Sequence, residues 1–249
     1  MLEKISKKRL IPFLSEEIEV LSFSSLDSTN TRAKTFLLEG LAAPFLVIAN
    51  KQTAGRGRQG KSFYSKKNSG IYMSLAVDKD FVSSSAITAA VAVSVATAIN
   101  EQTNLNAKIK WVNDIYIEGK KVSGILCEAV KDADNNLQGY IIGIGINTDI
   151  KKFPKDIEDI ATSIKVENKN LLAVTIINNL MDNLTDKDNS FLEKYKEWSL
   201  CLGKEVIYTE KDKSKTAKAI DIDENGGLII EENGNLKTLS GGEISLRLK

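Results

Sequence analysis

Residues 55–62 read GRGRQGKS and place three glycines among three cationic side chains, Arg56, Arg58 and Lys61. Glycine lets the backbone turn sharply and approach a ligand closely, because it has no Cβ. Cations this close together repel one another, so a bound anion that neutralised them would also order the loop. This composition predicts a loop that binds a phosphate or a carboxylate.

The same string matches two phosphate-loop patterns, the Walker A motif G-x-x-x-x-G-K-[ST] and the dinucleotide-binding motif G-x-G-x-x-G. Both motifs need a strand directly before the loop and a helix directly after it, because the helix N-terminus meets the phosphates. Here KQTA separates the glycines from the strand predicted at 45–50, and the next predicted element is a strand at 71–77. This context disfavours a P-loop NTPase and a dinucleotide-binding fold.

Three later segments place polar side chains in or beside apolar strands, and two of them also contain glycines. A glycine inside a strand weakens the sheet, so it needs a reason. A ligand that lies flat on the sheet is one reason, and tight packing against a helix is the other. The segments are IKWVND with Lys110, Asn113 and Asp114, EGKKVSGILCE with Lys120, Lys121 and Gly124, and GIGIN with Gly143, Gly145 and Asn147.

The composition of the 249 residues excludes several kinds of chemistry. Lys and Arg total 34 and Asp and Glu total 33, so the chain lacks the basic excess of a nucleic-acid binder. It has no histidine and only two cysteines, Cys127 and Cys201, which disfavours structural zinc and His-dependent catalytic triads. Any reaction therefore has to use Lys, Arg, carboxylates, backbone N–H groups or a bound cation.

The sequence predicts no membrane segment and a cytoplasmic location. Its N-terminus lacks the continuous apolar core of a signal peptide. The only long apolar run, 86–99, is shorter than a spanning helix requires and is rich in Ala, Ser and Thr. Small side chains allow close packing, so this run is predicted to form a buried helix.

The order of elements predicts an α+β fold, with a mixed or antiparallel sheet and flanking helices, because regular βαβα alternation is missing. Beyond residue 203, short strands alternate with Gly, Asn and Asp turns, which is typical of a small all-β domain. We therefore expect domains at 1–203 and 204–249. Besides the two strands above, the pattern predicts a strand at 140–149 and helices at 83–102, 169–186 and 189–199.

The chain also carries five motifs in a fixed order. They are DSTN (27–30), KQTAGRGRQG (51–60), KWVND (110–114), KKVSGIL (120–126) and GIGIN (143–147). This set resembles the biotin protein ligases, over roughly residues 20–249. The resemblance implies the class II synthetase-like catalytic fold of biotin and lipoate ligases, followed by a small SH3-like β-barrel. It also implies that biotin and MgATP form biotinyl-5′-AMP, and that a lysine of a biotin carboxyl carrier domain then displaces AMP.

The resemblance implies roles for individual residues. Those assigned to biotin are Ser28, Thr29, Asn30, Gln52, Gly55, Arg56, Gly57, Arg58, Lys121, Gly124 and Gly143. Those assigned to the nucleotide are Arg58, Lys61, Phe63, Lys110, Asn113 and Asn147. The expected catalytic residues are Arg56, Arg58, Lys110 and Lys121. Asp114 has three open interpretations: a Mg²⁺ ligand, a base toward the incoming amine, or the partner of a neighbouring cation.

The chain departs from the family pattern at Gln59, Lys61 and Phe63, where Arg, Arg and Trp are usual. Lys61 keeps a charge but cannot make a bidentate contact, and Phe63 keeps a stacking surface without an indole N–H. Fewer than thirty residues precede DSTN, so we expect no DNA-binding repressor domain. A homodimer through the sheet is expected. The alternatives are a lipoate–protein ligase-like enzyme and a biotin-binding sensor that performs no transfer.

Overall fold

A computed structural model describes residues 3–81, 86–210, 213–241 and 245–248, and its main feature is a seven-stranded sheet in the order β1-β2-β3-β7-β6-β5-β4. Only the β1–β2 pair is parallel among these neighbours, so the mixed α+β fold predicted from the sequence is confirmed. The strands are β1 Glu19–Phe23, β2 Phe45–Ala49, β3 Gly70–Asp78, β4 Lys108–Lys110, β5 Asp114–Ile117, β6 Lys120–Lys131 and β7 Leu137–Asn147.

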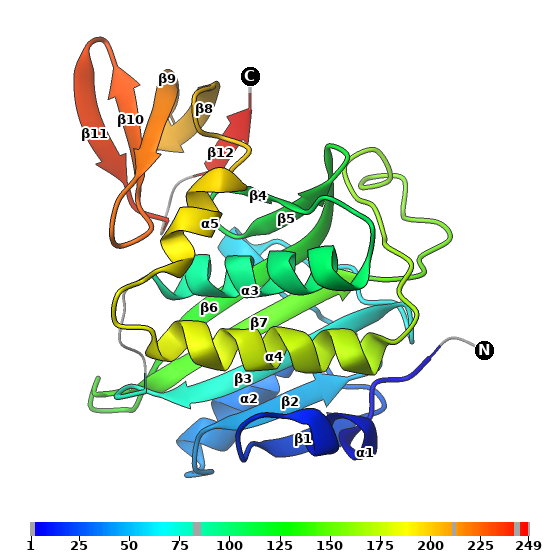
Figure 1. Ribbon diagram of the computed structural model, residues 1–249. Coiled ribbons are helices and arrows are strands. Elements are labelled where there is room, and N and C mark those ends of the chain that lie inside the picture. The colour runs from blue at the N-terminus through cyan, green and yellow to red at the C-terminus, as the bar shows by residue number, and fades with distance from the viewer. Residues whose placement is uncertain (1–2, 82–85, 211–212, 242–244, 249) are drawn as a thin grey trace.

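Helices cover both faces of this sheet (Figure 1). Helices α3 and α4 lie on one face, with α5 packed against α3, whereas α2 contacts β2, β3 and β7 from the other face. The helices are α1 Lys7–Leu10, α2 Thr29–Leu38, α3 Ile87–Gln102, α4 Lys169–Thr185 and α5 Phe191–Glu197, with short 3-10 turns η1 Ile11–Phe13 and η2 Arg58–Gly60.

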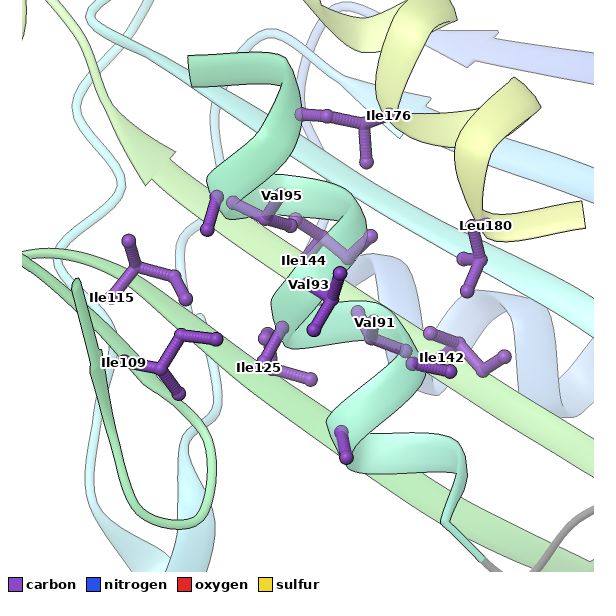
Figure 2. Close-up of a cluster of buried hydrophobic side chains, with 14 of the residues drawn as sticks. Val91, Val93, Val95, Ile109, Ile115, Ile125, Ile142, Ile144, Ile176 and Leu180 are labelled. Atoms are coloured by element: carbon purple, nitrogen blue, oxygen red, sulfur yellow. The ribbon is translucent and has the colours of Figure 1, made fainter. Parts of the chain in front are cut away.

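Strand alternation decides which residues face each helix layer. In β7, Ile142, Ile144 and Ile146 point into the main core, so Gly143 and Gly145 face the opposite side with α2. Figure 2 shows the core side, where valines of α3 lie over isoleucines of the central strands. The α2 side of the sheet is therefore poor in large apolar side chains along β7.

Helix α3 contains the apolar run that the sequence assigned to a buried helix. Its alanines and valines from Ala89 to Val93 are each at most 2% exposed, because small side chains let the helix pack closely on the strands. The buried helix is confirmed, although it begins at Ile87 and residues 83–85 of the prediction lie outside the described residues. Within the described ranges, no helix is long and apolar enough to cross a membrane.

The C-terminal region forms a second, five-stranded antiparallel sheet in the order β11-β10-β9-β8-β12, which confirms the predicted small all-β unit (Figure 1). Its attachment to the large sheet includes a buried hydrogen bond from Trp111 Nε1 to the carbonyl oxygen of Gly226, at 3.0 Å. The strands are β8 Glu205–Glu210, β9 Lys213–Ile222, β10 Leu228–Glu232, β11 Asn235–Leu239 and β12 Ser245–Leu248.

The segment before β1 has structure that the sequence pattern did not predict. Asparagine side chains from distant elements pair with its backbone: Asn50 with Ile5, and Asn178 with the carbonyl of Phe13. Asn170 in α4 accepts from the backbone of Ser6 in the same way. These contacts are tertiary, which is why local propensity does not reveal the short helix α1.

Candidate active site

One cavity of about 840 Å³ collects nearly all of the residues that the sequence assigned to a site. Of those residues only Gly55 is missing from its lining, and a Cβ at Gly55 would meet the carbonyl oxygen of Phe63 at 2.5 Å. The assigned residues in the lining are Ser28, Thr29, Asn30, Gln52, Arg56, Gly57, Arg58, Lys61, Phe63, Lys110, Asn113, Asp114, Lys121, Gly124, Gly143 and Asn147.

The arginine loop, residues 55–62, is a closed turn rather than the start of a helix. Arg56 and Ser62 form an antiparallel bridge, and Gly57 N donates to the Lys61 carbonyl at 2.7 Å. Gly60 adopts a positive φ of 73°, which glycine allows without strain. The next regular element is β3, so neither phosphate-loop motif has the helix that it requires.

Both arginines of this loop have protein partners. Arg56 makes a bidentate ion pair with Glu128, at 2.8 Å for the shorter contact. Arg58 donates to Asn113 Oδ1 at 3.2 Å and to the carbonyl oxygen of Gly241 in the C-terminal domain. The mutual repulsion of the loop cations is therefore relieved by protein groups, whereas the sequence analysis considered only a bound anion.

Glu128 is a functional candidate that the sequence analysis missed. It follows Gly124 and Leu126 at every second position of β6, so all three share the α2 face of the sheet. This spacing was the available signal. The spacing indicates that Glu128 lies on the α2 face of the sheet. It does not indicate the contact with Arg56, because Arg56 lies 72 residues away in the chain.

The glycines of β7 make room for protein side chains. A Cβ on Gly143 would collide with the side-chain amide of Asn30, which lies over this glycine between Ser74 and Leu126. A Cβ on Gly145 would lie 2.6 Å from the ring of Phe63. At Gly143 the tight packing is with helix α2, which is the second of the two explanations that the sequence left open.

The start of α2 is capped by a side chain from another segment of the chain. Ser28 occupies the N-cap position, but its side chain makes no capping hydrogen bond. Gln52 Oε1 takes that place, since it accepts from Thr29 N at 2.8 Å and from Thr29 Oγ1 at 3.2 Å. Gln52 Nε2 then donates to Ser65 Oγ at 2.8 Å, so this amide is held at both ends.

A group of charged residues forms the other end of the cavity. Lys121 Nζ lies 2.6 Å from Asp114 Oδ1, and Lys110 Nζ lies 3.5 Å from the hydroxyl of Tyr116. Burial lowers the pKa of the Arg58 guanidinium, and the nearby Asp114 carboxylate opposes this effect. Burial, reinforced by Asp114, raises the pKa of Tyr116 to about 12, so this phenol is neutral at physiological pH. Among the described residues, five cationic side chains thus share this cavity with the single carboxylate of Asp114: Arg56, Arg58, Lys61, Lys110 and Lys121.

Asn147 presents an unused acceptor in the cavity. The residue is 5% exposed, and its Nδ2 donates to the Thr162 carbonyl at 3.1 Å. Its Oδ1 is buried and has no hydrogen-bond partner among the described residues. An unpaired buried acceptor is costly, so a ligand N–H at this point would be stabilising.

The segment 157–161 forms an apolar wall that the sequence analysis did not assign to the site. Ile157, Ile160 and Ala161 line the cavity. The wall is joined to Lys121 through its backbone, because Lys121 N donates to the Ile160 carbonyl at 2.9 Å. No periodic pattern marks so short a stretch, whose position depends on tertiary contacts such as this one and the bond from Lys120 Nζ to the Glu158 carbonyl.

No group of three or more Asp, Glu or Cys side chains is arranged to hold a metal ion within the described ranges. Asp114 is the carboxylate closest to the cationic group, and it is paired with Lys121. The structure therefore favours the third interpretation of Asp114 in the ligand-free protein, as the partner of a neighbouring cation.

Comparisons with known proteins agree on one family. The biotin/lipoate A/B protein ligase family matches residues 22–147, and the biotin protein ligase C-terminal domain matches residues 201–247. The bifunctional ligase/repressor BirA of Bacillus subtilis is 31% identical over 234 residues, which cover 89% of this chain and 72% of that protein. The biotin–[acetyl-CoA-carboxylase] ligase of Mycobacterium tuberculosis is 26% identical over 215 residues, 80% of this chain and 77% of that protein.

A solved structure extends this agreement to three dimensions. The biotin protein ligase from Aquifex aeolicus in complex with biotin and ATP matches with a TM-score of 0.81 and 29% sequence identity. The match covers 93% of this chain and 99% of that one. The chain therefore belongs to the biotin/lipoate A/B protein ligase family, and within that family it is a biotin protein ligase.

Proposed function

We propose that this enzyme joins biotin to ATP as biotinyl-5′-AMP and then transfers the biotinyl group to a lysine of a biotin carboxyl carrier domain. One observation carries the proposal: a single cavity has an end rich in hydroxyls and amides and an end rich in cations. Biotin has the same division, with a polar ureido ring at one end and a carboxylate at the other. ATP supplies the further anion that the cationic end requires.

The ureido ring is expected to contact Ser28, Thr29 and Gln52. Hydroxyls and amides offer both donors and acceptors, as a urea requires. Asn30 contributes differently from the sequence interpretation, because its Nδ2 already donates to Leu126 and Glu128. We therefore assign Asn30 mainly to shaping the pocket, with one acceptor position left for ligand on its Oδ1, which already accepts from Ser74 Oγ.

The first step brings two anions together, since the biotin carboxylate attacks the α-phosphorus of ATP and pyrophosphate leaves. Lys110, Lys121 and Arg58 oppose this repulsion and stabilise the charge that develops on the phosphate oxygens. Holding both substrates in one cavity also removes much of the entropic barrier. Lys121 exchanges its pairing with Asp114 for the substrate anion in this scheme.

The adenine is expected to lie toward Asn147 and Phe63. The free Oδ1 of Asn147 suits the exocyclic amine of adenine, and Phe63 offers an aromatic face. Mg²⁺ fits this site as an ion held chiefly by ATP phosphates and water, with Asp114 as its one candidate protein ligand. Lys61 and Asn113 complete the proposed nucleotide side.

In the second step the carrier lysine attacks the acyl carbon, the bond to AMP breaks, and an amide remains. No covalent enzyme intermediate is required. This agrees with the two cysteine thiols, whose pKa values are raised by burial, to about 12 for Cys127. Such thiols are protonated at neutral pH and are poor nucleophiles.

Three finer points are also proposed. We assign residues 1–203 to catalysis and 204–249 to the accessory domain, which is supported by the start of the second sheet at Glu205. We propose a homodimer, to be tested by light scattering at several protein concentrations. We also propose a cytoplasmic location, which is supported by the unpaired thiols of Cys127 and Cys201.

The test is to incubate the protein with MgATP, a carrier domain and either biotin or lipoate, and to measure the mass of the carrier. We expect biotin to be attached to one lysine and a carrier with that lysine replaced by arginine to stay unmodified. Attachment of lipoate alone would favour the lipoate ligase alternative. Tight biotin binding without any labelled carrier would favour the sensor.

A further inference from the structure

We propose that Glu128 is a positioning residue that holds Arg56 at the rim of the cavity and fixes the side-chain amide of Asn30, an inference that rests on the function proposed above. Its Oε1 accepts from Arg56 Nη2 at 2.8 Å. Its Oε2 accepts from Arg56 Nη1 at 3.2 Å and from Asn30 Nδ2 at 2.9 Å. One carboxylate therefore joins the arginine loop to the first turn of α2.

The contacts continue from this carboxylate as an unbroken polar path across the floor of the cavity. Asn30 Oδ1 lies 2.6 Å from Ser74 Oγ, which in turn lies 2.8 Å from Thr29 Oγ1. Thr29 donates to Gln52, and Gln52 donates to Ser65. Ser65 lies three residues beyond the arginine loop, so the path connects the two flanks of the loop across the sheet.

The position of Glu128 indicates that it acts through its neighbours and not by touching substrate. The side chain is absent from the lining of the substrate cavity. It lines instead a second cavity of about 790 Å³, behind the loop, together with residues of the C-terminal domain such as Asn225 and Gly227. Arg56 borders both cavities and Asn30 lines the substrate cavity, so these two partners are the groups through which Glu128 reaches the substrate side.

The exposure of the Arg56–Glu128 pair indicates that it positions side chains and contributes little to the stability of the fold. The Arg56 side chain is 45% exposed and that of Glu128 is 27% exposed. An ion pair this accessible to water contributes little to stability. Its geometric effect is larger, because two parallel N–H contacts fix the plane of the guanidinium. Removing the carboxylate should therefore free the arginine without unfolding the chain.

Glu128→Gln is the sharpest test, because it preserves shape but leaves one acceptor oxygen where two are needed. We expect pre-formed biotinyl-5′-AMP to dissociate about tenfold faster than from the unmodified enzyme, with kcat changed less than about threefold. In ligand-free protein, amide hydrogen exchange across residues 55–62 should accelerate, while the midpoint of thermal unfolding stays unchanged. Glu128→Asp, which keeps the charge, should recover part of the retention.

The coupling to Arg56 is tested in the Arg56→Ala background, where Glu128→Gln should add less than about twofold to the dissociation rate. Glu210→Gln is the matched control, since it removes a carboxylate paired with Lys237 in the C-terminal sheet, and retention should not change. The inference would be overturned if Glu128→Gln and the unmodified enzyme showed the same adenylate dissociation rate and the same amide hydrogen exchange. It would also be overturned if Glu128→Gln still accelerated adenylate dissociation tenfold in the Arg56→Ala background. If the unmodified enzyme formed no adenylate, the proposed function itself would fail, which is a separate result.

Discussion

The arginine loop and the sheet floor beneath it are positioned in different ways. The floor is set by backbone ladders, in which Gly143 pairs with both Ser74 and Leu126. The loop has two short backbone closures of its own and is otherwise held by side-chain contacts from Arg56 and Arg58. Changes in the floor should therefore cost stability and activity together, whereas changes in the loop should affect ligand alone.

The largest expected effect is in the floor, at Gly143→Ala. The added Cβ would collide with the side chain of Asn30, so α2 has to shift. We expect a loss of about 1–3 kcal/mol in the free energy of unfolding, together with loss of biotin binding. Urea unfolding and biotin titration would measure both. Ala129→Val, on an exposed position of β6, is the control and should change neither quantity appreciably.

Lys121→Ala should come second, with adenylate formation slowed about 100-fold because a cation directed at the developing charge is lost. The free energy of unfolding should change by less than about 1 kcal/mol, since the Lys121–Asp114 pair is partly exposed. Biotin-dependent pyrophosphate exchange measures the rate. Lys120→Ala, the exposed neighbour that contacts only the Glu158 carbonyl, should behave as the unmodified enzyme. An unchanged exchange rate in Lys121→Ala would remove this lysine from the site.

Arg56→Ala and Arg58→Ala should weaken retention of the adenylate by about tenfold or more while the fold stays intact. The effect of Arg58 should be the larger, because its guanidinium is more withdrawn from water. Rapid filtration of labelled adenylate measures retention, and circular dichroism checks the fold. Lys66→Ala, a solvated cation just beyond the loop, provides the control. If either arginine variant unfolded, the loop would prove to be structural, and the contrast with the floor would disappear.

The smallest effect expected is a dependence of floor stability on alkaline pH. Burial raises the pKa of Cys127 in β6 from 9.0 to about 12, so the folded thiol stays protonated where the unfolded one ionises. The unfolded chain then binds fewer protons, and stability falls as pH rises above 9. Between pH 8 and 9.5 this thiol should account for about 0.8 kcal/mol. Urea unfolding of Cys127→Ala should fall less steeply over that range; an identical slope would contradict the assignment.

The sequence predicted the residues of the sheet floor more completely than the contacts that hold the arginine loop. The strand predicted at 140–149 and its unusual glycines were recognised because both are local to one stretch of sequence. The family motifs also brought most of the cavity lining together in advance. Glu128, the wall at 157–161 and the cap supplied by Gln52 were missed, because each depends on a contact between segments far apart in the chain. For the same reason, the sequence could not show that Asn30 fills the space over Gly143.

Two of the bonds that join the catalytic part to the C-terminal sheet have a mechanical consequence. Trp111 anchors the carbonyl of Gly226, and Arg58 reaches the carbonyl of Gly241. Any displacement of the small sheet would move the Arg58 guanidinium, which we propose faces the phosphate. A carrier protein that docked on the C-terminal sheet and displaced it would thereby weaken the contacts that retain the acyl-adenylate during transfer.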